Sequence, residues 1–304
     1  MLHSIVSFYK FTTIRDPKKL KKTLQSFLLN ENIIGTFLIA KEGINATISG
    51  DSKSTQKVIN FFRKRKNFND LEYKRSNSTR KPFKRLKIKI KDEIVTLGKN
   101  TCDPCKITGN FVDPKNWNKL ITDSKVLLID VRNAYETRIG SFAKSLNPNI
   151  KNFRDFPNFV RKNLDQKKNQ KIAMYCTGGI RCEKASSYLL QLGFKKIYQL
   201  KGGILKYFEK NNNQSSRFRG ECFVFDERVS LNKHLAKGRY EQCYACRMPI
   251  SKHDIRSPKY KKGISCPSCF SKTSTKQKKR FGERQRLINF ANLKNINHFS
   301  SQKK

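Results

Sequence analysis

Two cysteines frame a glycine pair and an arginine in the stretch YCTGGIRCE, which runs from Tyr175 to Glu183. The apolar run at 171–174 predicts a strand before it, and we expect a helix to begin near Arg181. A glycine turn between a strand and a helix lets backbone N–H groups converge on one point, where the helix N-terminus adds positive potential. A thiol at that point is stabilised as the thiolate, which is the nucleophilic form. The stretch therefore predicts a nucleophilic Cys176 in an anion-binding loop.

The spacing between Cys176 and Arg181 distinguishes two kinds of anion loop. The residues between them are Thr177, Gly178, Gly179 and Ile180. Cys-x5-Arg loops fit a phosphate, whereas the shorter Cys-x4-Arg ring suits a sulfur anion on the cysteine. Phosphatase chemistry is therefore a minor alternative. A merely buried Cys176 would not require the Gly-Gly turn.

Four further residues are expected to support this loop. We predict that Arg181 holds the anion or a substrate phosphate, with a solvated side chain as the alternative. Cys182 either faces the same pocket and resolves a disulfide or persulfide on Cys176, or merely packs in the helix. Asp130 and Arg132 follow a predicted strand, at the edge where α/β sheets bind ligands, and we interpret them as an ion pair that shapes the pocket.

A second cysteine set lies downstream, and its members are Cys243, Cys246, Cys266 and Cys269. Two Cys-x2-Cys pairs separated by 19 residues have the spacing of a four-thiolate zinc site. Reduced thiols without metal and an iron–sulfur cluster are the alternatives. Four thiolates leave no open coordination position, so the predicted zinc is structural.

The remaining cysteines give weaker signals. Cys102 and Cys105 form a lone Cys-x2-Cys pair, for which half a metal site is the minority interpretation. Cys222 fits an apolar strand position. With nine cysteines, an odd number, and no secretory signal at the N-terminus, we expect reduced thiols in the cytoplasm.

The elements that would carry these residues form two domains joined by a linker, and a C-terminal part follows them. Residues 1–99 read as β-α-β-β-α-β, closed by a strand at Arg85–Lys91, which predicts a ferredoxin-like (acylphosphatase-like) sandwich. Residues 100–117 are punctuated by proline and glycine and predict a linker. Residues 118–212 alternate strands and helices, which predicts an α/β domain with a parallel sheet.

The C-terminal part of the chain is not expected to build a large apolar core of its own. Residues 217–271 contain the four predicted zinc cysteines and few apolar residues, so we expect a bound metal ion to stabilise their fold. Residues 272–304 are a basic tail, which we interpret as a helix or arm ordered against RNA or the protein's own body.

The net charge is the strongest signal in the composition. The chain has 66 Lys and Arg against 23 Asp and Glu, a formal charge of +43, which favours a polyanionic partner, above all nucleic acid. The alternative is a general compositional bias towards residues such as lysine, although such a bias alone does not explain the scarcity of acidic residues. No run of 18 apolar residues exists, so no membrane span is predicted.

Several motifs together resemble known families. LIDVRNAYETRIGSF (128–142) and QLKGGILKYFE (199–209) resemble elements of the rhodanese domain. KEGINATISG, FRDF, MYCTGGIRCEKAS and GECFVFDERVS, in that order, resemble the oxygen-dependent tRNA uridine hydroxylases, and this resemblance runs from about residue 3 to 285. It implies a persulfide on Cys176, O₂ as co-substrate, and the anticodon region of tRNA as partner.

Cofactor signals are otherwise negative. The four histidines are widely spaced, no Gly-x-Gly-x-x-Gly follows a strand, and no flavin, haem or nicotinamide signal is present. No motif identifies an electron donor. The leading hypothesis is a tRNA hydroxylase, with a persulfide sulfurtransferase and a non-enzymatic RNA-binding adaptor as alternatives.

Overall fold

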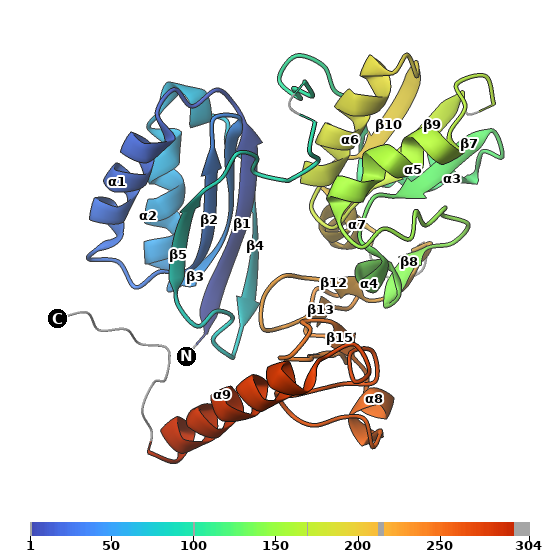
Figure 1. Cartoon of the computed structure of the whole chain (residues 1–304). Helices are drawn as coiled ribbons and strands as arrows, with labels where there is room; N and C mark the ends of the chain where they lie inside the picture. Colours follow the sequence, from blue (N-terminus) through green and yellow to red (C-terminus); the bar gives the residue numbers. More distant parts are fainter. Residues whose placement is uncertain (1, 100, 169, 212–215, 295–304) are drawn as a thin grey trace.

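The chain folds into three parts in this computed structural model, which describes residues 2–99, 101–168, 170–211 and 216–294. Figure 1 shows an N-terminal sheet with two helices, an α/β domain beside it, and a C-terminal segment that ends in a long helix. None of the described helices is long and apolar enough to cross a membrane.

The N-terminal part is a ferredoxin-like sandwich with one additional strand. Its elements are β1 (His3–Phe11), α1 (Pro17–Leu28), β2 (Ile34–Ala40), β3 (Gly43–Gly50), α2 (Ser52–Arg63), η1 (Lys66–Phe68), β4 (Tyr73–Ser78) and β5 (Leu86–Ile90). The sheet order is β4-β1-β3-β2-β5. Helix α1 begins where Asp16 accepts a hydrogen bond from the Lys19 N–H and Pro17 takes the first turn.

The strand that closes this fold is not the predicted one. Strand β4 pairs antiparallel with β1 and completes the β-α-β-β-α-β unit, whereas β5, predicted at Arg85–Lys91, pairs parallel with β2 at the opposite edge. The sequence YKRSNS of β4 shows no apolar alternation because this edge strand is only half-buried. Strand β5 alternates because Leu86 and Ile88 pack against the core beneath the helices.

The α/β domain follows. Its elements are β6 (Asn110–Val112), α3 (Pro114–Thr122), β7 (Val126–Asp130), α4 (Ala134–Thr137), β8 (Gly140–Phe142), η2 (Phe153–Asp155), α5 (Phe156–Asn163), β9 (Lys171–Tyr175), α6 (Ile180–Gln191), β10 (Lys196–Leu200) and α7 (Gly203–Lys210). The parallel sheet has the order β6-β10-β9-β7. Ile172 and Met174 belong to one apolar cluster and Ala173 to another, so both faces of the sheet are covered, as the sequence predicts.

The expected linker at 100–117 carries part of this domain. Strand β6 pairs with β10, and α3 begins at Pro114 after the Asp113 cap. A proline read as a chain breaker is here a first-turn helix residue, because its missing N–H has no partner to lose at that position.

The C-terminal segment is joined to the α/β domain by a strand pair. Its elements are β11 (Phe218–Gly220), β12 (Cys222–Phe223), β13 (Ser230–Leu231), β14 (Glu241–Gln242), β15 (Pro249–Ile250), α8 (Lys252–Arg256) and α9 (Thr275–Leu293). Strand β11 pairs with β8, and Phe218 packs edge-on against Phe142.

The basic tail is helical over most of its length. Helix α9 docks on the cysteine-rich segment, where Arg284 donates to the carbonyls of Tyr244 (2.7 Å) and Gly263 (3.0 Å). This contact supports the interpretation of an arm held by the protein's own body. Residues 295–304 of the tail lie outside the described residues.

Candidate active site

The loop after β9 surrounds Cys176 with hydrogen-bond donors. Strand β9 ends at Tyr175, α6 begins at Ile180, and the Gly179 N–H donates to the Cys176 Sγ at 3.1 Å. Gly179 has a φ of 110°, and a Cβ there would lie 2.6 Å from the Tyr9 hydroxyl, so both backbone and space require glycine. The predicted strand-loop-helix is therefore confirmed, with the cysteine at its centre.

Cys176 is held as a thiolate. Its side chain is fully buried, which by itself opposes ionisation. Hydrogen bonds from Cys182 and Gly179, together with the charge of Arg181, nevertheless lower the pKa of the Cys176 thiol to about 5. Cys176 is therefore ionised at neutral pH and has the chemical form of a nucleophile.

Cys182 faces this sulfur rather than packing away from it. It lies in the first turn of α6, fully buried, and its thiol hydrogen bonds to Cys176. Burial and the neighbouring thiolate raise the pKa of Cys182 well above its ordinary value. Cys182 is thus the protonated partner of the pair in this structure.

Arg181 pairs with a glutamate that the sequence analysis did not identify as a site residue. Its two terminal nitrogens donate to the Glu136 carboxylate at 2.5 and 2.7 Å, and both side chains are buried. The solvated alternative for Arg181 is therefore wrong. Glu136 belongs to the AYET segment of the rhodanese-like stretch, and an acid there was the available signal.

Asp130 and Arg132 form the expected ion pair. The Arg132 Nε lies 2.9 Å from one Asp130 oxygen and its Nη2 lies 2.6 Å from the other, and Nη2 also donates to the Gly140 carbonyl. Both side chains are fully buried beneath β8. The pair therefore holds the chain after β7 in place and does not reach the cavity beside Cys176, whose lining residues exclude it.

The first residues of α7 hold the other side of the loop. The backbone N–H groups of Ile204 and Leu205 donate to the carbonyls of Cys176 and Thr177 at 2.9 and 3.2 Å. A Cβ on Gly203 would lie 2.5 Å from the Cys176 carbonyl oxygen. The backbone of the loop is therefore held from both helices, which keeps the N–H groups aimed at the sulfur.

All three parts of the protein line the cavity beside Cys176. This cavity has a volume of about 520 Å³ and includes Cys176, Thr177, Gly178, Ile180 and Arg181 from the loop. The open face of the N-terminal sheet contributes Ser7, Tyr9, Thr36, Asn45, Thr47 and Lys74. The turn between β12 and β13 contributes Phe225, Asp226 and Arg228. The size lies within the usual range for small-molecule sites.

Two side chains of the N-terminal sheet contact the loop directly. Lys74 donates to the Gly178 carbonyl at 2.9 Å, and the Tyr9 hydroxyl donates to Glu183 at 2.6 Å. Burial, opposed by the Tyr9 hydrogen bond but reinforced by the Cys176 thiolate, raises the pKa of Glu183 to about 7. Sequence reasoning missed Tyr9, Lys74 and Glu183 as site residues, because nothing in the local pattern relates these positions.

A buried lysine holds the same two domains together. Lys184 of α6 forms ion pairs with Glu42 at 2.7 Å and with Glu93. Glu42 belongs to KEGINATISG and Lys184 to MYCTGGIRCEKAS. Residues from two of the motifs that carry the family resemblance therefore meet in one contact between the domains.

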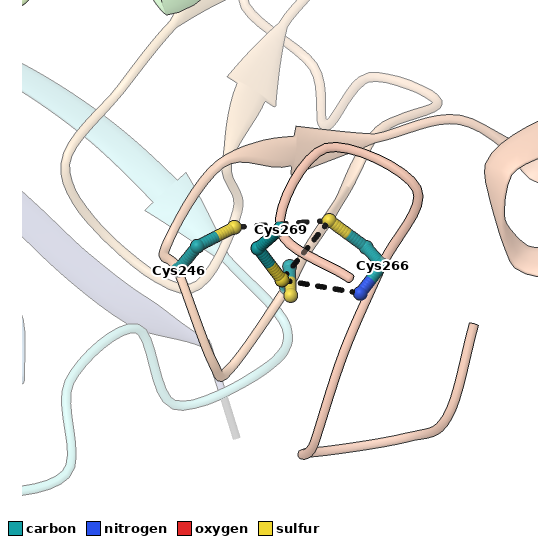
Figure 2. Close-up of side chains that lie close together, drawn as sticks. Cys246, Cys266 and Cys269 are labelled. Atoms are coloured by element: carbon teal, nitrogen blue, oxygen red, sulfur yellow. Dashed lines mark hydrogen bonds between the residues drawn. The ribbon is translucent and has the colours of Figure 1, made fainter. Parts of the chain in front are cut away.

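The four predicted zinc cysteines lie together. The Sγ atoms of Cys243, Cys246, Cys266 and Cys269 are all within 4.8 Å of one another. Figure 2 shows the sulfurs of the last three pointing toward each other, with Cys266 Sγ 3.7 Å from those of Cys246 and Cys269. Tetrahedral Zn–S bonds of about 2.3 Å would place the sulfurs about 3.8 Å apart. The cluster is able to bind a metal ion such as zinc. Its four sulfurs would fill all four positions of a tetrahedral site.

Cys102 and Cys105 are not part of a comparable cluster. Cys102 is buried and contacts Gln191, whereas Cys105 is exposed. Within the described ranges, the only group of three or more His, Cys, Asp or Glu side chains that could hold a metal ion is the four-cysteine set.

Two family models match separate regions of the chain. A family model described as UPF0176 acylphosphatase like domain matches residues 3–94, and one described as rhodanese-like domain matches residues 113–210.

Solved structures of rhodanese-like proteins are similar to about a third of this chain. A rhodanese-related protein from Thermoplasma volcanium is 27% identical, covers 34% of this chain and 95% of its own, and has a TM-score of 0.27. A rhodanese-like domain protein from Staphylococcus aureus is 21% identical, with 35% and 99% covered and a TM-score of 0.29. The rhodanese-like domain of an Anabaena protein is 17% identical, with 36% and 77% covered and a TM-score of 0.31. The chain thus joins a region that matches the UPF0176 acylphosphatase-like domain to one that matches the rhodanese-like domain.

Proposed function

We propose that this protein is a cytosolic tRNA-modifying enzyme that hydroxylates the wobble uridine at C5 in an oxygen-dependent reaction. The observation that carries the proposal is the cavity at Cys176, because the acylphosphatase-like sheet and the C-terminal segment both line it. A rhodanese domain that only accepted sulfur from a small donor would not need two further domains around its cysteine. A large substrate, held by several domains at once, would.

The chemistry follows from the thiolate. Addition of the Cys176 sulfur to C6 of uracil forms a C–S bond and moves the C5–C6 electron pair toward C5 and O4. The electron-rich C5 then reacts with O₂, and loss of the C5 proton and of the thiolate restores the ring as the 5-hydroxy product. The second oxygen atom leaves as water, which requires two electrons and two protons from a donor such as a cellular thiol.

Cationic side chains near the cavity favour an RNA substrate. Lys87 and Lys89 alternate along β5, Arg85 precedes the strand, and Lys91 directly after it lines the cavity. Burial and the charges of Arg85, Lys89 and Arg247 lower the pKa of Lys87, so cations of the sheet and of the cysteine-rich segment lie close together. Helix α9 adds further exposed lysines and arginines. Such surfaces bind nucleic acid phosphates and make the affinity depend on salt.

The anticodon loop is the site in tRNA that this arrangement fits. Chemistry at C5 and C6 of a base requires that the base leave its stack, and unstacking costs least in a single-stranded loop. The cationic surface would hold the anticodon arm while the base enters the cavity. The four-cysteine cluster would hold zinc and stabilise the segment from which the turn at 224–229 extends.

Mass spectrometry of tRNA nucleosides from a deletion strain tests the proposal. We expect 5-hydroxyuridine and its derivatives to disappear, to return with the wild-type gene, and to remain absent with Cys176→Ser. Cys105→Ser is the matched control, because this exposed cysteine lies outside the cavity. Normal hydroxylation in the Cys176→Ser strain would refute the role of the thiolate.

A persulfide sulfurtransferase is the second candidate, which the rhodanese-like match and the short Cys-x4-Arg loop both favour. In that case the tRNA of the deletion strain would lack thiolated uridine and retain 5-hydroxyuridine. An RNA-binding adaptor without catalysis would leave both nucleosides unchanged in the Cys176→Ser strain.

A further inference from the structure

One aromatic side chain at the cavity is exposed where its neighbours are buried. Phe225 is 64% exposed, whereas Val224 and Asp226 on either side are 5% and 7% exposed. Burial normally stabilises a phenylalanine side chain, so this exposure forgoes a stabilising contact. Phe225 also lines the Cys176 cavity.

The turn that presents Phe225 is held rigidly. Asp226 binds Arg228 through two hydrogen bonds of 2.9 and 2.7 Å, and Arg228 reaches across to the Ser76 hydroxyl of β4 at 2.8 Å. Val229 has a φ of 65°, which a β-branched residue adopts only under constraint. The turn is therefore tied to the N-terminal sheet, and the position of Phe225 is set by contacts other than its own burial.

The ring itself is supported from one side. Phe223, which is buried, meets Phe225 edge-on with centroids 5.1 Å apart, and Tyr135 in turn meets Phe223 edge-on at 5.3 Å. Despite these contacts, Phe225 remains 64% exposed. An accessible ring with a fixed orientation is what a flat ligand needs for stacking.

Phe225 lies next to the reactive loop. The guanidinium carbon of Arg181 is 5.9 Å from the centre of its ring, and Arg181 helps lower the pKa of Cys176. In the same cavity the sheet supplies polar groups in one row, in which Lys74, Ser7, Thr47 and Thr36 are register partners on neighbouring strands. A planar ring on Phe225 would thus have hydrogen-bonding groups and the thiolate within one cavity.

We propose that Phe225 is the stacking platform for the substrate base, a pyrimidine that leaves the RNA stack and enters the Cys176 cavity. This inference rests on the proposed function, because it takes a nucleotide in RNA as the substrate. Stacking holds the base by its face, whichever pyrimidine it is, and leaves the polar edges for the sheet residues. Phe225 is accordingly a binding residue and does not take part in proton or sulfur transfer.

Binding to two RNA stem-loops tests the inference without any turnover. One is an anticodon stem-loop with uridine at the wobble position, and the other is identical but abasic there. We expect Phe225→Leu to weaken binding of the uridine loop by about tenfold to a hundredfold, the usual effect of losing one base–aromatic stack. Binding of the abasic loop should not change. Phe225→Tyr retains the ring and should bind both loops like the wild type.

The outcomes separate this inference from the proposed function. If Phe225→Leu weakens binding of both loops equally, or of neither, Phe225 does not stack on the base, and the proposed action on RNA is unaffected by that result. If the wild type binds neither loop, the proposed tRNA substrate and the inference both fail. The pH dependence of Cys176 alkylation, measured on each variant, shows that the loop beside Phe225 remains folded.

Discussion

The two cysteine sites of this protein use the same side chain in opposite ways. At the rhodanese-like loop one thiolate, Cys176, meets the N–H of Gly179 and the thiol of Cys182, while Arg181 lends positive charge. In the C-terminal segment four sulfurs converge on one another within 4.8 Å. One thiolate among donors is stabilised yet keeps a lone pair for chemistry. Four crowded sulfurs repel as thiolates unless a cation lies between them.

The difference shows that the surroundings, and not the cysteine, decide between reactivity and structure. The loop draws its donors from the turn itself, and α7, Tyr9 and Lys74 hold that turn in place. The cluster draws all its ligands from two short Cys-x2-Cys turns and has a small apolar core of its own. Each site can therefore be perturbed separately.

Loss of metal from the cluster should have the largest effect. We expect one zinc per chain by elemental analysis, and its loss in Cys266→Ser, because three thiolates bind zinc far more weakly than four. Structural zinc contributes about 10–16 kcal/mol in small domains, so residues 217–294 should unfold and become sensitive to protease. Cys105→Ser should keep the metal. Full zinc content in Cys266→Ser would contradict the four-thiolate site.

Removal of Glu136 should be the next largest perturbation. In Glu136→Ala the buried Arg181 loses both of its carboxylate contacts, and an uncompensated buried charge costs about 3–5 kcal/mol. Denaturant unfolding of the variant measures this loss. Lys171→Ala, which breaks the half-exposed pair with Asp123, is the control and should cost about 1 kcal/mol or less. Equal effects of the two variants would show that the Arg181 pair is not structural.

The smallest expected effect is on the ionisation of Cys176. The hydrogen bond from Cys182 favours the thiolate, and hydrogen bonds to charged groups are worth about 1.5–3 kcal/mol. Cys182→Ala should therefore raise the pKa of Cys176 from about 5 by about one to two units. Alkylation by iodoacetamide, followed by mass spectrometry, measures the shift.

The sign of this pH dependence is fixed by the thiolate. In the wild type the reaction rate should be level above the pKa and fall about tenfold for each unit below it, because only the thiolate reacts. In Cys182→Ala the fall should begin at higher pH, while Cys105→Ala should leave the Cys176 profile unchanged. An unshifted profile in Cys182→Ala would show that Cys182 is a bystander.

Much of the fold could be predicted because its signals are local. The apolar runs of β7, β9 and β10, the Asp16-Pro17 helix start and the glycine turn after Cys176 each lie within a few residues. The errors came where local pattern and position disagreed. Strand β4 is polar because it is only half-buried, and β6 is too short to show a period.

The two cysteine sites are encoded locally, since Cys-x4-Arg between a strand and a helix and two Cys-x2-Cys pairs specify their own local geometry. The residues that surround the sites depend on how the distant parts of the chain pack. Glu136 lies beside Arg181, Lys74 and Tyr9 lie beside the loop, and Phe225 lies at the cavity. These residues are 44 to 174 positions away from their partners along the chain. Their proximity depends on how the three parts pack, through contacts such as Lys184 with Glu42, and no spacing along the chain encodes that packing.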